Sequence, residues 1–274
     1  MRGARGTLRL LSARRRAGGR DREASRLAVL PAVFLAALVA VGLTEPAAAE
    51  PAGPETAPKS EAAEKACRPD RFGGQVCGAG ETAVRVIAET VSPSGRHAFA
   101  WGAPDGIERE PDVENVRIVL VRLADGAVLA KLGGHYWSTG EMRANRQAES
   151  AVWAPDERAV VEIADSRWST YSLRYVALAK DGAARTLDLL PLVETAARAR
   201  LRQAMPRETK GREFMVSGDA PARLDARGRL SLGATLFVPK ADASFDLAMR
   251  VAITRGKAGT PTAGIVSMRQ VPSR

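Results

Sequence analysis

The sequence is poor in the side chains that perform catalysis and bind metals. Its 274 residues include two histidines and two cysteines, and aromatic residues make up only 5%. We find no Gly-x-Ser-x-Gly, no Ser-x-x-Lys with its partner motifs, no His-Glu-x-x-His and no phosphate-binding loop. The enzyme classes that these motifs define therefore have no support, and we expect neither a cofactor nor a bound metal.

The first 49 residues have the three parts of a secretory signal peptide. Residues 1–26 contain nine arginines, residues 27–43 carry no charge, and small side chains follow at Ala47 and Ala49. This order predicts export with cleavage after Ala49, and so a periplasmic or secreted protein without membrane contact. The alternative is an uncleaved anchor, although 17 uncharged residues interrupted by Pro31 are short for a membrane span.

Most of the positive charge belongs to this leader. Nine arginines and three acidic residues give positions 1–49 a charge of +6, so +4 of the total of +10 remains on the mature chain. A charge of this size is ordinary for a soluble domain and leaves no basic stripe on the folded part. The composition therefore argues against nucleic-acid binding.

Both cysteines, Cys67 and Cys77, lie in the mature chain. An even number of cysteines in an exported protein predicts a disulfide, which would close a short loop at the start of the domain. The alternatives are a redox dithiol and a metal site. The spacing is not Cys-x-x-Cys and the two histidines lie apart in the sequence, so both alternatives are less favoured.

Beyond the leader, the chain divides into a linker and a domain rich in strands. Residues 50–66 consist mainly of Ala, Pro, Glu and Lys without an apolar period, which predicts a disordered linker. Residues 67–274 fit a single domain. Its short apolar runs end in turns with Pro, Asp or Gly, the pattern of antiparallel hairpins. We therefore expect a mainly β fold of about three repeated antiparallel meanders.

One α-helix is expected near residues 191–205, inserted between the second and third meanders. Four apolar side chains recur there at intervals of four residues, namely Val193, Ala197, Leu201 and Met205. This spacing places them on one face of a helix, which would pack on an open edge or end of the sheets. Pro206 would end the helix.

Each meander contains a polar turn before an apolar strand, at residues 92–96, 154–158 and 225–229. These turns resemble the Ser-Pro-Asp-Gly-Arg-like turn of TolB-type β-propellers. The residues kept are Pro93, Gly95 and Arg96 in the first copy and Trp153, Pro155, Asp156 and Arg158 in the second. The second copy has Glu157 where Gly is usual, and the third has lost the Pro. The resemblance implies a propeller-like or incomplete propeller fold and no function; the alternative is a β-sandwich.

Two loops join aromatic residues to hydroxyl side chains outside the apolar strands. Residues 136–139 read Tyr-Trp-Ser-Thr, and residues 167–171 read Arg-Trp-Ser-Thr-Tyr. Trp and Tyr offer a large contact area at low entropic cost, so the loops predict a surface for a sugar, a peptide or a protein. Its residues would be His135, Tyr136, Trp137, Arg167, Trp168 and Tyr171. The alternative is that both tryptophans fill the core.

His135 is the only candidate for a general base in a polar loop, but no nucleophile or orienting carboxylate is evident beside it. The acidic loop at residues 105–114 offers oxygen ligands for calcium, although its spacing fits no known calcium loop. We therefore expect an exported, non-enzymatic binding or scaffold protein of the bacterial cell envelope, with an unknown protein, peptide or glycan partner. The alternative is an envelope hydrolase that uses His135.

Overall fold

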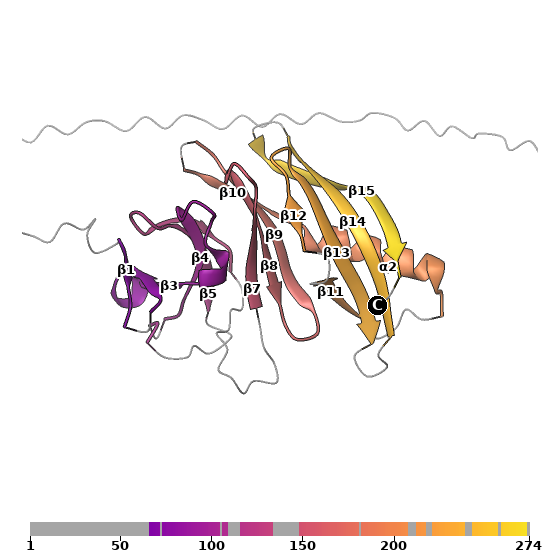
Figure 1. Cartoon of the computed structure of the whole chain (residues 1–274), viewed down its shortest axis with the longest axis horizontal. Helices are drawn as coiled ribbons and strands as arrows, with labels where there is room; N and C mark the ends of the chain where they lie inside the picture. Colours follow the sequence, from indigo (N-terminus) through magenta and orange to yellow (C-terminus); the bar gives the residue numbers. More distant parts are fainter. Residues whose placement is uncertain are drawn as a thin grey trace, which may run out of the picture. The chain divides into compact units, whose positions relative to one another are not determined.

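The computed structural model describes residues 66–71, 73–104, 106–108, 116–133, 148–180, 182–207, 212–217, 221–238, 243–256 and 259–272. All of them belong to one compact unit, Thr56–Arg274. They form three antiparallel sheets of six, four and five strands together with one α-helix (Figure 1). The predicted mainly β fold with an inserted helix is confirmed. The predicted leader, and all but the last residue of the predicted linker, lie outside the described residues.

Sheet A is a meander in which each strand pairs with the next along the chain. Its strands are β1 (Cys67–Pro69), β2 (Gln75–Cys77), β3 (Val84–Val86), β4 (His97–Gly102), β5 (Arg117–Arg122) and β6 (Ala127–Lys131). Cys67 lies directly opposite Cys77 in the β1–β2 pair, and the two form the predicted disulfide. The bond ties together the short hairpin at one edge of the sheet.

The strand β3 is short because it lies between two 3-10 turns. The chain forms a 3-10 turn at η1 (Gly80–Thr82) before β3, and a second one at η2 (Ala88–Thr90) after it. Thr90 explains the second turn, because its hydroxyl donates to the carbonyl of Ile87 (2.7 Å) and accepts from the N–H of Phe99 (2.9 Å). A short hydroxyl side chain that bonds nearby backbone in this way competes with strand pairing.

Sheet B is a second meander, with strands β7 (Ala148–Trp153), β8 (Ala159–Asp165), β9 (Thr170–Leu178) and β10 (Ala184–Asp188). It is covered on both faces. Val160 and Val176 pack in one hydrophobic core, whereas their neighbours Val161 and Tyr175 pack in another. This double burial explains why residues 159–164 are almost continuously apolar instead of alternating.

The helix α2 (Leu190–Ala204) follows β10 and has Pro191 in its first turn, where a missing N–H does no harm. It begins and ends one residue earlier than predicted. Val193, Ala197 and Leu201 form its buried face, at the expected spacing. The strands of sheet C are β11 (Glu213–Ser217), β12 (Arg223–Leu224), β13 (Arg229–Val238), β14 (Ala243–Arg255) and β15 (Pro261–Val271). Figure 1 shows α2 behind β13–β15.

Two hydrophobic cores hold the three sheets together. The first lies between sheets A and B and includes Phe99, Leu120 and Val160. The second lies between sheet B, α2 and sheet C and includes Leu201 and Leu247. Sheets A and C therefore contact opposite faces of sheet B. The described residues form no propeller, because sheets stacked on the two faces of a middle sheet do not close into a ring.

Candidate functional site

Two of the polar turns identified in the sequence meet at one end of the interface between sheets A and B. Residues 92–96 lead into β4, and residues 154–158 connect β7 to β8. The second turn is closed by a hydrogen bond from the N–H of Glu157 to the carbonyl of Ala154 (2.9 Å) and gives Glu157 a φ of 53°. A side chain in this left-handed region costs about 1 to 2 kcal/mol, which is why Gly is usual there.

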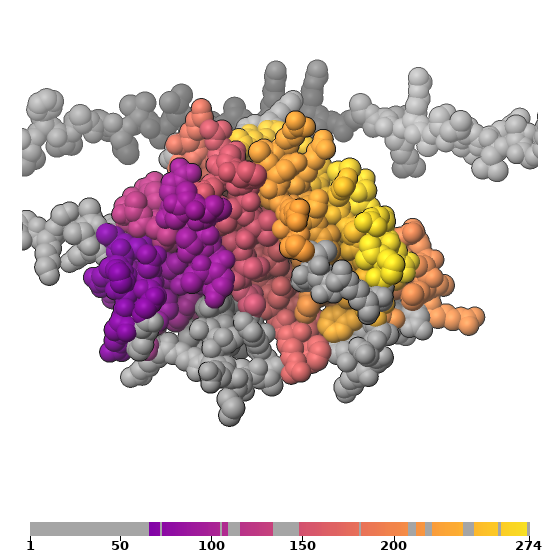
Figure 2. Space-filling view, in the orientation of Figure 1, coloured from indigo at the N-terminus to yellow at the C-terminus, as the bar shows by residue number. Residues whose placement is uncertain are grey.

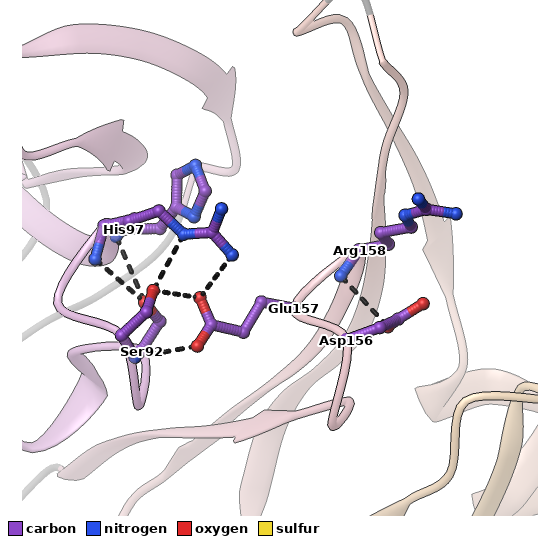
Figure 3. Close-up of polar contacts among 7 residues, drawn as sticks. Ser92, His97, Asp156, Glu157 and Arg158 are labelled. Carbon is purple, nitrogen blue, oxygen red and sulfur yellow. Dashed lines mark hydrogen bonds and ion pairs between the residues drawn. The ribbon is translucent and has the colours of Figure 1, made fainter.

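The carboxylate of Glu157 gains contacts that a glycine would lack. It accepts hydrogen bonds from the N–H (2.7 Å) and hydroxyl (2.5 Å) of Ser94 and lies 3.3 Å from the guanidinium of Arg96 (Figure 3). Glu157 is only 8% exposed. The bond from the Ser94 hydroxyl is the main reason why the pKa of Glu157 lies below its ordinary value, although burial opposes it. Glu157 is therefore ionised at neutral pH and links sheet B to sheet A. We call its contacts with Ser94 and Arg96 the Glu157 brace.

An aromatic pair lies beside this brace. The ring of His97 stacks on Trp153, with centroids 5.9 Å apart, and the indole N–H of Trp153 donates to the carbonyl of Thr90 (2.9 Å). Burial, helped by the charge of Arg96, lowers the pKa of His97, and Glu157 opposes them only in part. The imidazole is therefore neutral at pH 7. Its Nδ1 is buried and has no hydrogen-bond partner among the described residues.

A cleft of about 450 Å³ opens between the two sheets next to His97. We call it the inter-sheet cleft. Sheet A lines it with Arg96, His97, Arg122 and Leu129, and sheet B with residues 156–158, 178–180 and 182. The two sheets thus contribute comparable parts of its wall, so their relative position fixes its shape.

The lining of the inter-sheet cleft has four cationic side chains and two carboxylates. Arg122 pairs with Asp125, which lies outside the lining, at 2.6 Å. Arg158 and Lys180 form no ion pair with any residue that the structure describes, and Asp156 accepts only the backbone N–H of Arg158 (3.2 Å). The cleft thus offers two cations without a counter-ion, and a site of this kind favours an anion.

The six predicted binding residues are divided between described and undescribed parts of the chain. His135, Tyr136 and Trp137 lie outside the described residues. Arg167, Trp168 and Tyr171 lie in and beside the β8–β9 hairpin and do not line the inter-sheet cleft. Trp168 is 40% exposed. The guanidinium carbon of Arg167 lies 4.6 Å from its ring centroid, and the Phe237 ring centroid lies 6.2 Å away.

The opposite end of the same interface contains two buried glutamates that the sequence reasoning missed. Glu149 of β7 is 5% exposed and Glu162 of β8 is 1% exposed. Glu162 accepts the hydroxyl of Ser172 (2.9 Å) and lies 3.5 Å from Arg174. Neither carboxylate oxygen of Glu149 accepts a hydrogen bond from a donor among the described residues, and the Glu149 carboxyl group interacts with that of Glu162. The sequence feature that could have indicated this cluster is Glu162 itself, an acid inside the otherwise apolar run 159–164.

Burial dominates the electrostatics of this second cluster. It raises the pKa of Glu149 well above its ordinary value, and the charge of Glu162 raises it further. Burial also raises the pKa of Glu162, against the opposing charge of Arg174. One guanidinium thus faces two buried carboxyl groups. Glu149 therefore stays protonated far above the pH at which an exposed glutamate ionises.

The described residues show neither a hydrogen-bonded pair of the His97 ring with a serine nor a metal-binding cluster. The ring of His97 forms no hydrogen bond with a described serine, and the hydroxyl of Ser94 donates to Glu157 instead. No group of three or more His, Cys, Asp or Glu in the described part is placed to hold a metal. Most of the acidic loop at 105–114 lies outside the described part, and Glu108 pairs with Arg71 (2.8 Å).

No described helix is long and apolar enough to cross a membrane.

Comparison with known proteins adds no relatives. The chain matches no protein-family profile, no curated protein and no solved structure. The function proposed below therefore rests on the geometry of the inter-sheet cleft and of the Glu157 brace.

Proposed function

We propose that this protein is an exported, non-enzymatic binding protein of the bacterial cell envelope that holds an anionic group in the inter-sheet cleft. The observation that carries the proposal is the pair of cations, Arg158 and Lys180, that line the cleft without a counter-ion in the described structure. A volume of about 450 Å³ is in the range of small-molecule sites. The ligand is a carboxylate, carried by a small molecule or by a peptide or protein partner.

The walls of the cleft favour such a ligand in two further ways. Guanidinium groups bind carboxylates through two parallel hydrogen bonds, and the neutral His97 can offer a donor or an acceptor. The Glu157 brace fixes one wall before binding, which lowers the entropic cost of association. Export is supported by the predicted leader and by the Cys67–Cys77 disulfide, because disulfides persist in oxidising compartments.

A scaffold role would use a different surface. Trp168, with Arg167 stacked on it, is the one large aromatic side chain that is substantially exposed among the described residues. Aromatic and arginine side chains are frequent anchors in protein interfaces. The alternative of an envelope hydrolase rests on His135, which lies outside the described residues.

Calorimetric titration with citrate as the probe tests the cleft. We expect the double variant Arg158→Gln/Lys180→Gln to bind citrate at least about tenfold more weakly than the parent, a loss of about 1.4 kcal/mol. The matched control is Arg202→Gln/Arg207→Gln, which removes the same charge from exposed positions at the end of α2 and beyond it. Equal weakening in both variants would contradict the proposal, as would the failure of both citrate and an acidic peptide to bind the parent.

A further inference from the structure

The outer face of sheet C carries an ordered set of arginines and serines. Leu232, Met249 and Met268 lie opposite one another in β13, β14 and β15 and pack in the core beneath. Because side chains alternate between the two faces of a strand, their neighbours point outward. One outward row, in which each residue lies directly opposite the next across β12–β15, consists of Arg223, Ser231, Arg250 and Ser267.

A fifth residue extends this row into a shallow groove. Arg269 lies two residues beyond Ser267 on the same face, opposite Ala248. The two serines, Ala248, Arg250 and Arg269 line a groove of about 430 Å³ on this face. Because α2 passes behind β13–β15 in Figure 1, Figure 2 shows this outer side of sheet C. We call Arg223, Ser231, Arg250, Ser267 and Arg269 the arginine–serine row.

The charge of the row is not balanced within the described structure. Arg223, Arg250 and Arg269 are exposed and form no ion pair with a described residue. Two acids lie on this face: Glu213 at the β11 edge, and Asp246, which already accepts the hydroxyls of Thr235 (2.7 Å) and Ser244 (2.9 Å). Each arginine lies opposite a serine or an alanine, so none of the three guanidinium groups is directly opposed by another charge.

We propose that the arginine–serine row binds a linear inorganic polyphosphate chain, at a site separate from the inter-sheet cleft. A phosphate group offers enough oxygens to accept two N–H groups of a guanidinium and a serine hydroxyl together. Neighbouring strands lie about 4.8 Å apart, so the backbones of Arg223 and Arg250, two strands apart, are separated by about 10 Å. A chain lying across the strands meets successive guanidinium groups.

A lipid surface fits this face less well than a soluble chain. Binding at a membrane interface needs several large apolar side chains that enter the headgroup region, in addition to positive charge. Val266, at 65% exposure, is the single large hydrophobic side chain exposed on sheet C among the described residues. The hydroxyl and small side chains of Ser231, Ser267 and Ala248 lie between the arginines instead.

The test measures the binding of fluorescently labelled inorganic polyphosphate by anisotropy at several salt concentrations. We expect Arg250→Gln/Arg269→Gln to weaken binding by about tenfold or more and to reduce the salt slope by about two. The control Arg202→Gln/Arg207→Gln removes the same charge elsewhere and should change the affinity by less than about twofold. Thermal unfolding of each variant checks that the fold is intact.

Each other outcome overturns the proposal. Equal weakening in the control would mean general attraction to a basic protein. Weakening by Arg158→Gln/Lys180→Gln but not by the row variant would assign the phosphate chain to the inter-sheet cleft. Binding to phosphatidylglycerol vesicles without binding to polyphosphate would identify a lipid surface, and binding to neither would leave the row without this ligand. Citrate binding in the cleft is measured separately, so the two proposals fail independently.

Discussion

The carboxyl groups at the two ends of the interface between sheets A and B have pKa shifts of opposite direction. Glu157, 8% exposed at the turn end, accepts hydrogen bonds from Ser94. Glu149, 5% exposed at the other end, has no such donor among the described residues. The exposed fractions are similar, but Glu157 lies in a surface turn and has a lowered pKa, whereas Glu149 lies deep between the sheets and has a raised pKa. Hydrogen-bond donors therefore decide the ionisation of Glu157, whereas burial decides that of Glu149.

The two ends of the interface therefore differ in what holds them: ionic hydrogen bonds fix the turn end, whereas the other end needs a bound proton. At the turn end, the ionised Glu157 fixes the position of Arg96 and leaves Arg158 and Lys180 for a ligand. At the other end, Arg174 is the only described cation paired with either buried glutamate, so at least one proton has to be kept. We therefore expect anion binding to depend on the first end, and the pH dependence of stability to depend on the second.

The largest effect is expected from Arg174→Met. This change removes the counter-charge of Glu162 together with a hydrogen bond to the carbonyl of Leu132. Removing one partner of a buried ion pair costs about 3 to 5 kcal/mol, so the free energy of unfolding at pH 7 should fall by that amount. Urea unfolding measures it, with the exposed Arg202→Met as the control. A loss below about 1 kcal/mol would show that Arg174 does not balance the buried acids.

An intermediate effect is expected at the turn end. Glu157→Ala leaves the N–H and hydroxyl of Ser94 without their acceptor and should lower the free energy of unfolding by about 1 to 3 kcal/mol. Glu157→Gly loses the same contacts but relieves the left-handed backbone, so it should be more stable than Glu157→Ala by about 1 kcal/mol. Thermal unfolding of both variants measures the difference. If Glu157→Ala were as stable as the parent, the brace would contribute nothing.

The pH dependence of stability should change in Glu149→Gln. The raised pKa of Glu149 means that the folded state keeps a proton that the unfolded state releases above pH 4.5. The contribution of Glu149 to stability is therefore fully present below that pH and is lost as the pH rises towards its folded-state pKa, by at most about 1.4 kcal/mol per pH unit for one proton. The variant should show a flatter profile and exceed the parent in stability at pH 8. Parallel profiles from pH 5 to 8 would contradict this assignment.

The smallest effect is expected from Trp168→Ala, outside both ends of the interface. Its ring packs on Phe237 while remaining 40% exposed. Loss of one aromatic contact of this kind costs about 0.5 to 1.5 kcal/mol, and the pH profile should not change. Thermal unfolding at pH 5 and pH 8 measures both quantities. A loss of about 3 to 5 kcal/mol would instead assign Trp168 to the core.

Local features of the fold could be predicted from the sequence. The four-residue spacing of Val193, Ala197 and Leu201 indicates the buried face of α2. An even number of cysteines, both beyond the predicted leader, was sufficient to predict the disulfide. The polar turns at residues 92–96 and 154–158 are marked by their Pro residues, because proline presets the backbone of a turn. Each of these signals depends on residues close together in the sequence.

The contacts between sheets could not be predicted in the same way. Ser94 and Glu157 are 63 positions apart, and turn chemistry does not determine which turns meet. The TolB-like turns therefore suggested a propeller, whereas the two cores on opposite faces of sheet B determine a stack. Glu162 was missed for a related reason. A strand buried on both faces has no apolar alternation that would show which side an acid faces.

The opposite ionisation of Glu157 and Glu149 is tested most directly by following the side-chain carboxyl carbons of the glutamates by NMR during a pH titration. Glu157 should titrate below pH 4.5 and Glu149 above it, because hydrogen bonds stabilise the first carboxylate while burial disfavours the second. The two signals are assigned by their loss from the spectra of the Glu157→Gln and Glu149→Gln variants. A Glu157 signal that titrates above that of Glu149, or two signals that both titrate near pH 4.5, would contradict the comparison.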